Sequence, residues 1–211
     1  MLSKRYIIYF IFLFIFFGCS NHNKQKVIIF FEKPPVLKQE HDLLFKLSSK
    51  ISEKNISQFL SNQNWINSFL VKKQFFKPLK IFIETKQPQY IWQEKFYLDD
   101  NLSKFLYYGE NSNLLRLNMP IELIKEWKQS EKRFNNLIKI YDLKFFSVTF
   151  SEAEGWYFYT NNNIRINVGS DLSSDRFDKL SSILKYIFEK NLTPSVIDLR
   201  YKDGAALNYG K

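Results

Sequence analysis

Reactive and turn-forming side chains of several kinds are scarce in this sequence, and each scarcity excludes a class of protein. One Cys in 211 residues cannot build a disulfide framework or a cysteine-ligated zinc site. Two His, at His22 and His41, leave little material for histidine-dependent catalysis, and we expect both to be solvated side chains. Six Gly and six Pro are too few for a collagen-like or low-complexity chain.

Catalytic motifs are missing as well. The sequence contains no P-loop, no Rossmann glycine pattern, no nucleophile elbow and no metal-spaced cluster of His, Cys and Asp. The acid pairs Asp99–Asp100 and Glu152/Glu154 are candidates for acid–base work, but their surroundings favour turn and loop carboxylates. We therefore predict a protein without catalytic residues, cofactor, metal or small-molecule substrate, and keep an enzyme as a third hypothesis.

Apolar and aromatic residues, by contrast, are plentiful. The chain has 22 Phe, 12 Tyr and 4 Trp and is 45% hydrophobic, which supports a folded core and excludes wholesale disorder. Its 211 residues allow one large domain or two small ones.

The first twenty residues have the layout of an export signal. Met1–Arg5 carries two basic residues and no acid, and Tyr6–Gly18 is almost wholly apolar. As a helix the apolar run is only ~20 Å long, whereas the hydrocarbon core of a bilayer is ~30 Å thick. Flanking polar and basic side chains that extend toward the headgroups can narrow this difference. Three interpretations stay open: a cleaved signal peptide, a lipoprotein signal that lipidates Cys19, and an uncleaved anchor. We favour the anchor because Phe16–Phe17 supplies no small residue for a cleavage site.

All three interpretations place residue 24 onward outside the cytoplasm, and this changes the meaning of the charge. The net charge of the whole chain is +10, and without Lys4 and Arg5 the remaining 29 basic and 21 acidic residues give +8. No basic run is longer than a pair such as Lys72–Lys73, so a concentrated phosphate-binding surface is absent. Nucleic acid is therefore not expected as a partner.

Hydrophobic periodicity predicts an α+β chain. Two short helices are expected within residues 36–64, a third opened by Pro120, and a fourth capped by Ser173 or Ser174. The Asp203–Gly204 dipeptide predicts a two-residue hairpin turn between the last two strands. Strands are expected at 26–31, 69–75, 79–84, 96–98, 105–108, 143–150, 156–160, 164–168, 196–201 and 205–209.

The C-terminal run Ile197–Tyr209, with the sequence IDLRYKDGAALNY, carries a family resemblance. Three earlier motifs stand in the order that the same family shows, namely Trp65–Ile66, the strand Leu79–Glu84 and the Gly155–Trp156 pair. Together these motifs resemble the bacterial cell division proteins FtsQ and DivIB over about residues 55–211, with an N-terminal anchor in addition. Residues 26–54 are short for the first strand and helix of that family's POTRA domain, which leaves a complete or an abbreviated domain open.

The resemblance implies a domain organisation. We expect a short cytoplasmic tail at 1–5, a transmembrane signal anchor at 6–20, a POTRA-like α/β domain at 26–92, and an FtsQ-type β domain at 93–211. The β domain is expected to hold an antiparallel sheet and two helices.

The resemblance also implies a function, namely a non-enzymatic divisome scaffold that binds FtsB- and FtsL-type proteins at the septum, in the inner membrane with its bulk in the periplasm. A chain that ends in a short strand leaves an unpaired edge, which invites strand addition by a partner. The residues expected to contact the partner are Arg200, Tyr201, Asp203, Gly204, Ala205, Leu207 and Tyr209.

Each of these residues has a structural alternative. Tyr201 and Tyr209 are expected as aromatic anchors, and Arg200 is expected either to pair with an acidic partner residue or to bond Asp198. Leu199 is expected in the core. An alternative function also stays open, in which the chain is a periplasmic lipoprotein or a POTRA-type chaperone in envelope assembly.

Overall fold

The computed structural model of the chain describes residues 27–33, 37–49, 53–109 and 113–210. The predicted tail and anchor at 1–20, which include Cys19, lie outside these described residues, as does His22. Among the helices formed by the described residues, none combines the length and apolarity needed to cross a bilayer.

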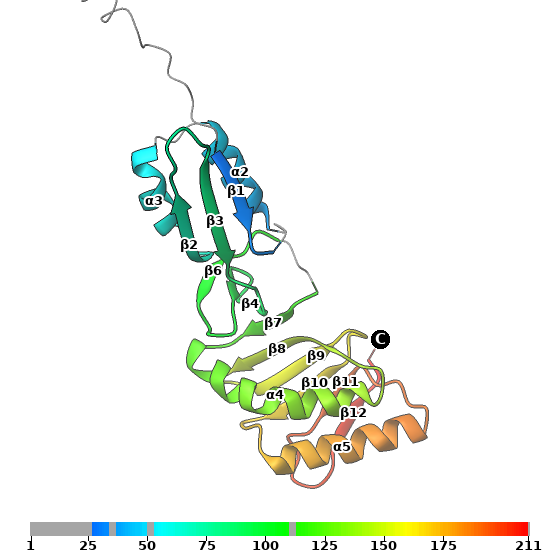
Figure 1. Ribbon diagram of the computed structural model, residues 1–211. Coiled ribbons are helices and arrows are strands. Elements are labelled where there is room, and N and C mark those ends of the chain that lie inside the picture. The colour runs from blue at the N-terminus through cyan, green and yellow to red at the C-terminus, as the bar shows by residue number, and fades with distance from the viewer. Residues whose placement is uncertain (1–26, 34–36, 50–52, 110–112, 211) are drawn as a thin grey trace, which may run out of the picture.

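A three-stranded sheet forms the N-terminal part, with the strand order β1-β3-β2. β1 (Val27–Phe31) runs parallel to β3 (Leu79–Thr85), and β2 (Ile66–Lys72) pairs with β3 on its other side, antiparallel. Helices α2 (Lys38–Ser49) and α3 (Glu53–Ser61) pack with it (Figure 1). The two short helices and the strand at 79–84 confirm the prediction.

A nine-stranded sheet follows, with the order β12-β11-β10-β9-β8-β7-β4-β5-β6. Helix α4 (Ile124–Lys139), preceded by a 3₁₀ turn at Ile121–Leu123, and helix α5 (Ser174–Glu189) bury their apolar residues in the same core as the sheet. The strands are β4 (Tyr90–Trp92), β5 (Phe96–Leu98), β6 (Lys104–Leu106), β7 (Leu115–Asn118), β8 (Phe145–Ser151), β9 (Gly155–Thr160), β10 (Arg165–Gly169), β11 (Val196–Asp198) and β12 (Ala206–Asn208).

The mixed α+β class is confirmed, but the prediction of an antiparallel sheet is wrong. The pairs β4–β7, β7–β8 and β10–β11 are parallel. The reason lies in the connections, because parallel neighbours need a crossover. Strands β5 and β6 lie in the connection from β4 to β7, and a helix lies in each of the other two. α4 connects β7 to β8, and α5 connects β10 to β11.

Three local predictions differ from the structure. The last two strands are joined by the seven-residue loop Leu199–Ala205 instead of a two-residue turn at Asp203–Gly204. The strand predicted at 69–75 spans Ile66–Lys72, so it ends before the two phenylalanines that follow. Strands β4 and β7 are absent from the predicted set.

Two hydrophobic cores meet on strands β4 and β5, whose side chains alternate between them, and β6 adds one side chain to the first core. Ile91, Tyr97 and Phe105 belong to the first core, with the three-stranded sheet and helices α2 and α3. Tyr90 and Leu98, one residue away from members of the first set, belong to the second core under α4 and α5. The domain boundary proposed at 92/93 stays a prediction, and β4 on its N-terminal side pairs within the nine-stranded sheet.

Candidate partner-binding edge

Strand β12 is the last strand of the nine-stranded sheet, and within the described ranges β11 is its single neighbour. Leu207 faces Ile197 across this pair, and both belong to an apolar row that crosses the sheet under the helices. The row continues strand by strand through Ile166, Phe158, Val148 and Leu117. Burial of Leu207 against this row holds the edge strand in register, with Ala206 and Asn208 exposed on either side of it.

Six of the seven predicted site residues lie in this edge strand and the loop before it, and Tyr209 directly follows the strand. Tyr201 and Tyr209 are 57% and 51% exposed. Asp203 is exposed, while Ala205 and Leu207 are half-buried and pack against the second core. Gly204 has a φ of +90°, and a Cβ built there would meet no atom within 4 Å. The loop therefore presents open space beside an aromatic residue at the sheet edge.

Two side chains of helix α5 hold this loop by donating hydrogen bonds to the loop's carbonyl groups. Arg176 Nη1 donates to the Leu199 carbonyl at 2.6 Å. Lys179 Nζ donates to the carbonyls of Tyr201 and Lys202 at 2.6 and 3.1 Å. One cationic side chain thus satisfies successive carbonyls of an irregular segment, which fixes the backbone that carries Tyr201.

Arg200 is bound to Asp198 within its own chain. Its Nε donates to Asp198 Oδ1 at 2.9 Å and its Nη2 to Oδ2 at 2.6 Å, and its backbone N–H also donates to Oδ1 at 3.0 Å. Hydrogen bonding to Arg200 holds the pKa of Asp198 below its usual value. Of the two expectations for Arg200, the structure shows the bond to Asp198, and the guanidinium is still 44% exposed. Leu199 is fully buried, as predicted.

The ion pair continues as a polar network over neighbouring strands. Asn167 Nδ2 donates to Asp198 Oδ2 at 3.4 Å and Arg165 Nε donates to Asn167 Oδ1 at 2.8 Å. Arg165 also pairs with Glu154 at 2.6 Å and stacks over Tyr157 with its guanidinium 4.3 Å from the ring centroid. This network orients Asp198, and through it Arg200, from the sheet side.

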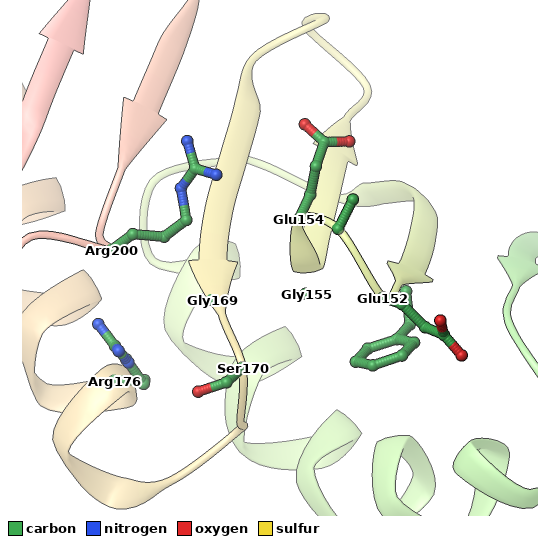
Figure 2. A pocket seen from close by; sticks show the side chains of 9 residues that line it. Glu152, Glu154, Gly155, Gly169, Ser170, Arg176 and Arg200 are labelled. Atoms are coloured by element: carbon green, nitrogen blue, oxygen red, sulfur yellow. The ribbon is translucent and has the colours of Figure 1, made fainter.

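A hollow lies beside the loop, between the β8–β9 turn and the N-terminal end of α5. Figure 2 shows Arg176 and Arg200 on one side of Gly169, with Glu152 and Glu154 on the other side. A Cβ on Gly169 would lie 3.4 Å from Arg176 Nη2 and 3.5 Å from Arg200 Cγ. The two arginines therefore gather at one rim, where carboxylates of a bound chain would find donors.

The acid pairs considered in the sequence occupy turns. Asp99 Oδ1 accepts the backbone N–H groups of Asn101 and Ser103 at 2.9 and 2.8 Å, as a turn carboxylate does. Glu152 and Glu154 lie in the turn between β8 and β9. Throughout the part of the chain that the structure describes, no three His, Cys, Asp or Glu residues are grouped so as to hold a metal ion.

Comparison with known proteins finds three cell division proteins. FtsQ of Vibrio cholerae is 25% identical over 153 residues, which are 69% of this chain and 56% of that protein. FtsQ of Aliivibrio fischeri is 24% identical over 153 residues, 69% of this chain and 57% of that protein. FtsQ of Shewanella oneidensis is 20% identical over 157 residues, 74% of this chain and 60% of that protein.

The chain is similar to proteins of the FtsQ/DivIB family over about 70% of its length. The resemblance inferred from the C-terminal motif is thereby confirmed. The chain spans little more than half the length of these FtsQ relatives. No family model matches it.

Sequence reasoning missed two residues of α5 that support this candidate edge, Arg176 and Lys179. Their spacing of three on a predicted helix places both side chains on one face, and this was the available signal. Their hydrogen bonds to the carbonyls of Leu199–Lys202 depend on where α5 packs, and a local sequence pattern does not predict that position.

Proposed function

We propose that this chain is a non-enzymatic scaffold of the cell division machinery at the septum. Residues 6–20 anchor it in the inner membrane, with the tail 1–5 in the cytoplasm and the bulk in the periplasm. Residues 26–92 form a POTRA-like domain and 93–211 an FtsQ-type β domain. The C-terminal edge of the latter binds FtsB- and FtsL-type proteins by strand addition and so links early and late division proteins.

One observation carries the partner site: β12 is a terminal strand of the sheet, flanked by two tyrosines that are more than half exposed. Exposed strand edges accept another strand through main-chain hydrogen bonds, and tyrosines are frequent hot spots of such interfaces. Similarity to this family supports a division role, since the three relatives carry the name cell division protein. Gly204 and Ala205 would let a partner backbone approach closely, and Asp203 would set its register.

The partner site is tested by Tyr201→Ala in the full-length chain. We expect a loss of about 1–3 kcal/mol in binding to the FtsB-type protein of the same organism, or roughly fivefold to 150-fold in Kd. The melting temperature should not change, because Tyr201 is 57% exposed. Tyr186→Ala is the matched control, since Tyr186 is 50% exposed on α5 and is not part of the edge. Binding equal to wild type after Tyr201→Ala would sink the proposed site.

The cellular role is tested by a fluorescent fusion in dividing cells. A septal band supports the divisome scaffold, and a uniform envelope signal in constricting cells contradicts it. Cys19→Ser separates the scaffold from the envelope lipoprotein or POTRA-type chaperone, because only a lipoprotein would lose its membrane attachment with that cysteine.

A further inference from the structure

The turn between β2 and β3 exposes two neighbouring phenylalanines. Phe75 is 86% and Phe76 98% exposed, the highest values among the exposed large hydrophobic side chains that the structure describes. Their rings touch in an edge-on arrangement with centroids 4.5 Å apart. A single exposed apolar residue is ordinary, but a pair that projects wholly into solvent indicates a contact with something apolar.

The backbone of this turn is held in an unfavourable conformation. Lys77 N–H donates to the Gln74 carbonyl at 3.2 Å, which closes a tight turn with the two phenylalanines at its centre. Phe76 has a φ of +59°, in the left-handed region where a bulky side chain is an outlier. Gly at this position would avoid the steric cost. The sequence instead places a ring there, which points to a use for the ring.

Lysines surround the pair. Lys72 and Lys73 precede it and Lys77 follows it, and all three are exposed. The sequence has no acidic residue between Glu53 and Glu84. Aromatic side chains flanked by lysines match the interface of an anionic bilayer, where rings sit at the headgroup level and ammonium groups meet lipid phosphates.

The turn lies at the end of the sheet where β1 begins. Val27 is the register partner of Leu79, and Lys72 that of Lys80, so the start of β1 and the β2–β3 turn share one end (Figure 1). The predicted anchor ends at residue 20, and the six residues 21–26 reach at most ~20 Å when extended. A bilayer that holds the anchor is therefore within reach of the turn.

We propose that the β2–β3 turn, Lys72–Lys77, is a second membrane contact that inserts Phe75 and Phe76 into the headgroup region of an anionic bilayer. This contact orients the three-stranded sheet on the membrane surface. It goes beyond the proposed scaffold function, and it uses the proposed anchor only to place the turn near lipid.

The test is fluorescence quenching of the full chain with Phe75→Trp, in vesicles that contain phosphatidylglycerol with brominated acyl chains. The four native tryptophans are all buried, with exposures of 0 to 8%, so they give little quenching of their own. We expect the new tryptophan to lose emission in these vesicles and wild type to lose far less. Phe76→Trp provides a second probe at the other ring. Quenching should decline in phosphatidylcholine vesicles, and after Lys72, Lys73 and Lys77 are all changed to Gln.

Ile140→Trp is the matched control, because Ile140 is 73% exposed at the end of α4, next to the second core. Quenching at position 140 equal to that at 75 would overturn the proposal, since it would mean general adsorption. An unquenched tryptophan at both 75 and 76, in a chain that stays with the vesicles through a carbonate wash, overturns the turn contact while the anchor stands. That result would instead fit a protein partner for the turn. If the carbonate wash removes the chain from the vesicles, the proposed anchor is contradicted. In that case, quenching of the tryptophan at 75 or 76 after the chain is simply mixed with vesicles still tests the membrane contact of the turn.

Discussion

Phe76 is the residue at which local conformation and side-chain identity disagree most plainly. A φ of +59° suits Gly, and the exposed ring makes no core contact that would offset the steric cost. Tertiary packing therefore does not account for a phenylalanine at this position, whereas contact with an apolar phase does.

Phe76→Gly should accordingly stabilise the isolated protein by about 1 kcal/mol, because it relieves the left-handed strain. Urea unfolding of the full chain in detergent measures this change. Phe75→Gly is the control, since Phe75 does not have a positive φ, and it should give no gain. A loss of stability on Phe76→Gly would contradict the assigned strain.

The Asp198–Arg200 pair predicts a pH-dependent contribution to stability. Arg200 lowers the pKa of Asp198 in the folded chain below the usual value of 3.8. A carboxyl group with a lowered folded pKa stabilises the protein above its usual pKa, and the contribution disappears as the pH falls through the lowered value. Because Arg200 is 44% exposed, the contribution is small, about 0.5–1 kcal/mol.

Arg200→Gln should thus lower the free energy of unfolding at pH 7, and its difference from wild type should shrink below pH 3.8. Urea unfolding at pH 7, 5, 3 and 2 follows both proteins. Lys185→Gln serves as control, because Lys185 faces Glu189 at 3.8 Å with both side chains well exposed, and it should change little at any pH. A difference that grows in acid would contradict the assignment.

Among the elements, strands β9 and β10 depend on an unusually close approach of two backbones. A Cβ on Gly155 would lie 2.2 Å from the Gly169 carbonyl oxygen, and Gly155 has a φ of +73°. The three nearest atoms all belong to the backbone of Gly169 and Ser170, so no flexible side chain could move aside to make room for the Cβ. The β8–β9 turn, which carries Glu154 toward Arg165, is built on this contact.

Gly155→Ala should therefore destabilise the chain by roughly 3 kcal/mol or more, through overpacking together with backbone strain. Gly204→Ala is the matched control: its φ of +90° carries strain but no atom lies within 4 Å, so it should lose only about 1 kcal/mol. Denaturant titration ranks the two variants. Equal losses would show that the backbone contact at Gly155 is relaxed at little cost.

At the scale of the whole molecule, strands β4 and β5 belong to both cores, and β6 adds Phe105 to the first. Ile91, Tyr97 and Phe105 are fully buried in the first core, while Tyr90 and Leu98 are buried in the second. Strands β4 and β5 have both faces covered, so neither core can open without exposing the far side of these two strands. The two parts of the molecule should behave as one cooperative unit.

Phe105→Leu tests this coupling, because Phe105 is fully buried and its ring lies 5.3 Å from that of Tyr97. We expect a loss of about 1–2 kcal/mol, with faster hydrogen exchange at the protected amides of β3 and β9 alike. Leu106→Ala in the same strand is the control, since Leu106 is 43% exposed and should have a small effect. Faster exchange in β3 with unchanged exchange in β9 would mean that the cores unfold separately.

The sequence by itself determined the elements whose apolar spacing is long and regular. Helices α4 and α5, strand β3 and the β9–β10 hairpin follow from periodicities of 3.6 and 2 residues, which report the face that a segment buries. It also carried the resemblance to the FtsQ/DivIB family, through the Ile197–Tyr209 motif and the ordered motifs before it. The exposure of Tyr201 and Tyr209 at the chain's end agrees with the predicted edge.

Tertiary structure alone decided which elements meet. Parallel pairing of β7 with β8 and of β10 with β11 depends on the path of the crossover helices, and the hold of Lys179 on the loop depends on where α5 packs. The same holds for β4 and β5, whose sequences do not show which core covers each of their two buried faces. Periodicity tells which side of a segment avoids water, whereas the partner across that side is set by contacts between residues far apart in the chain.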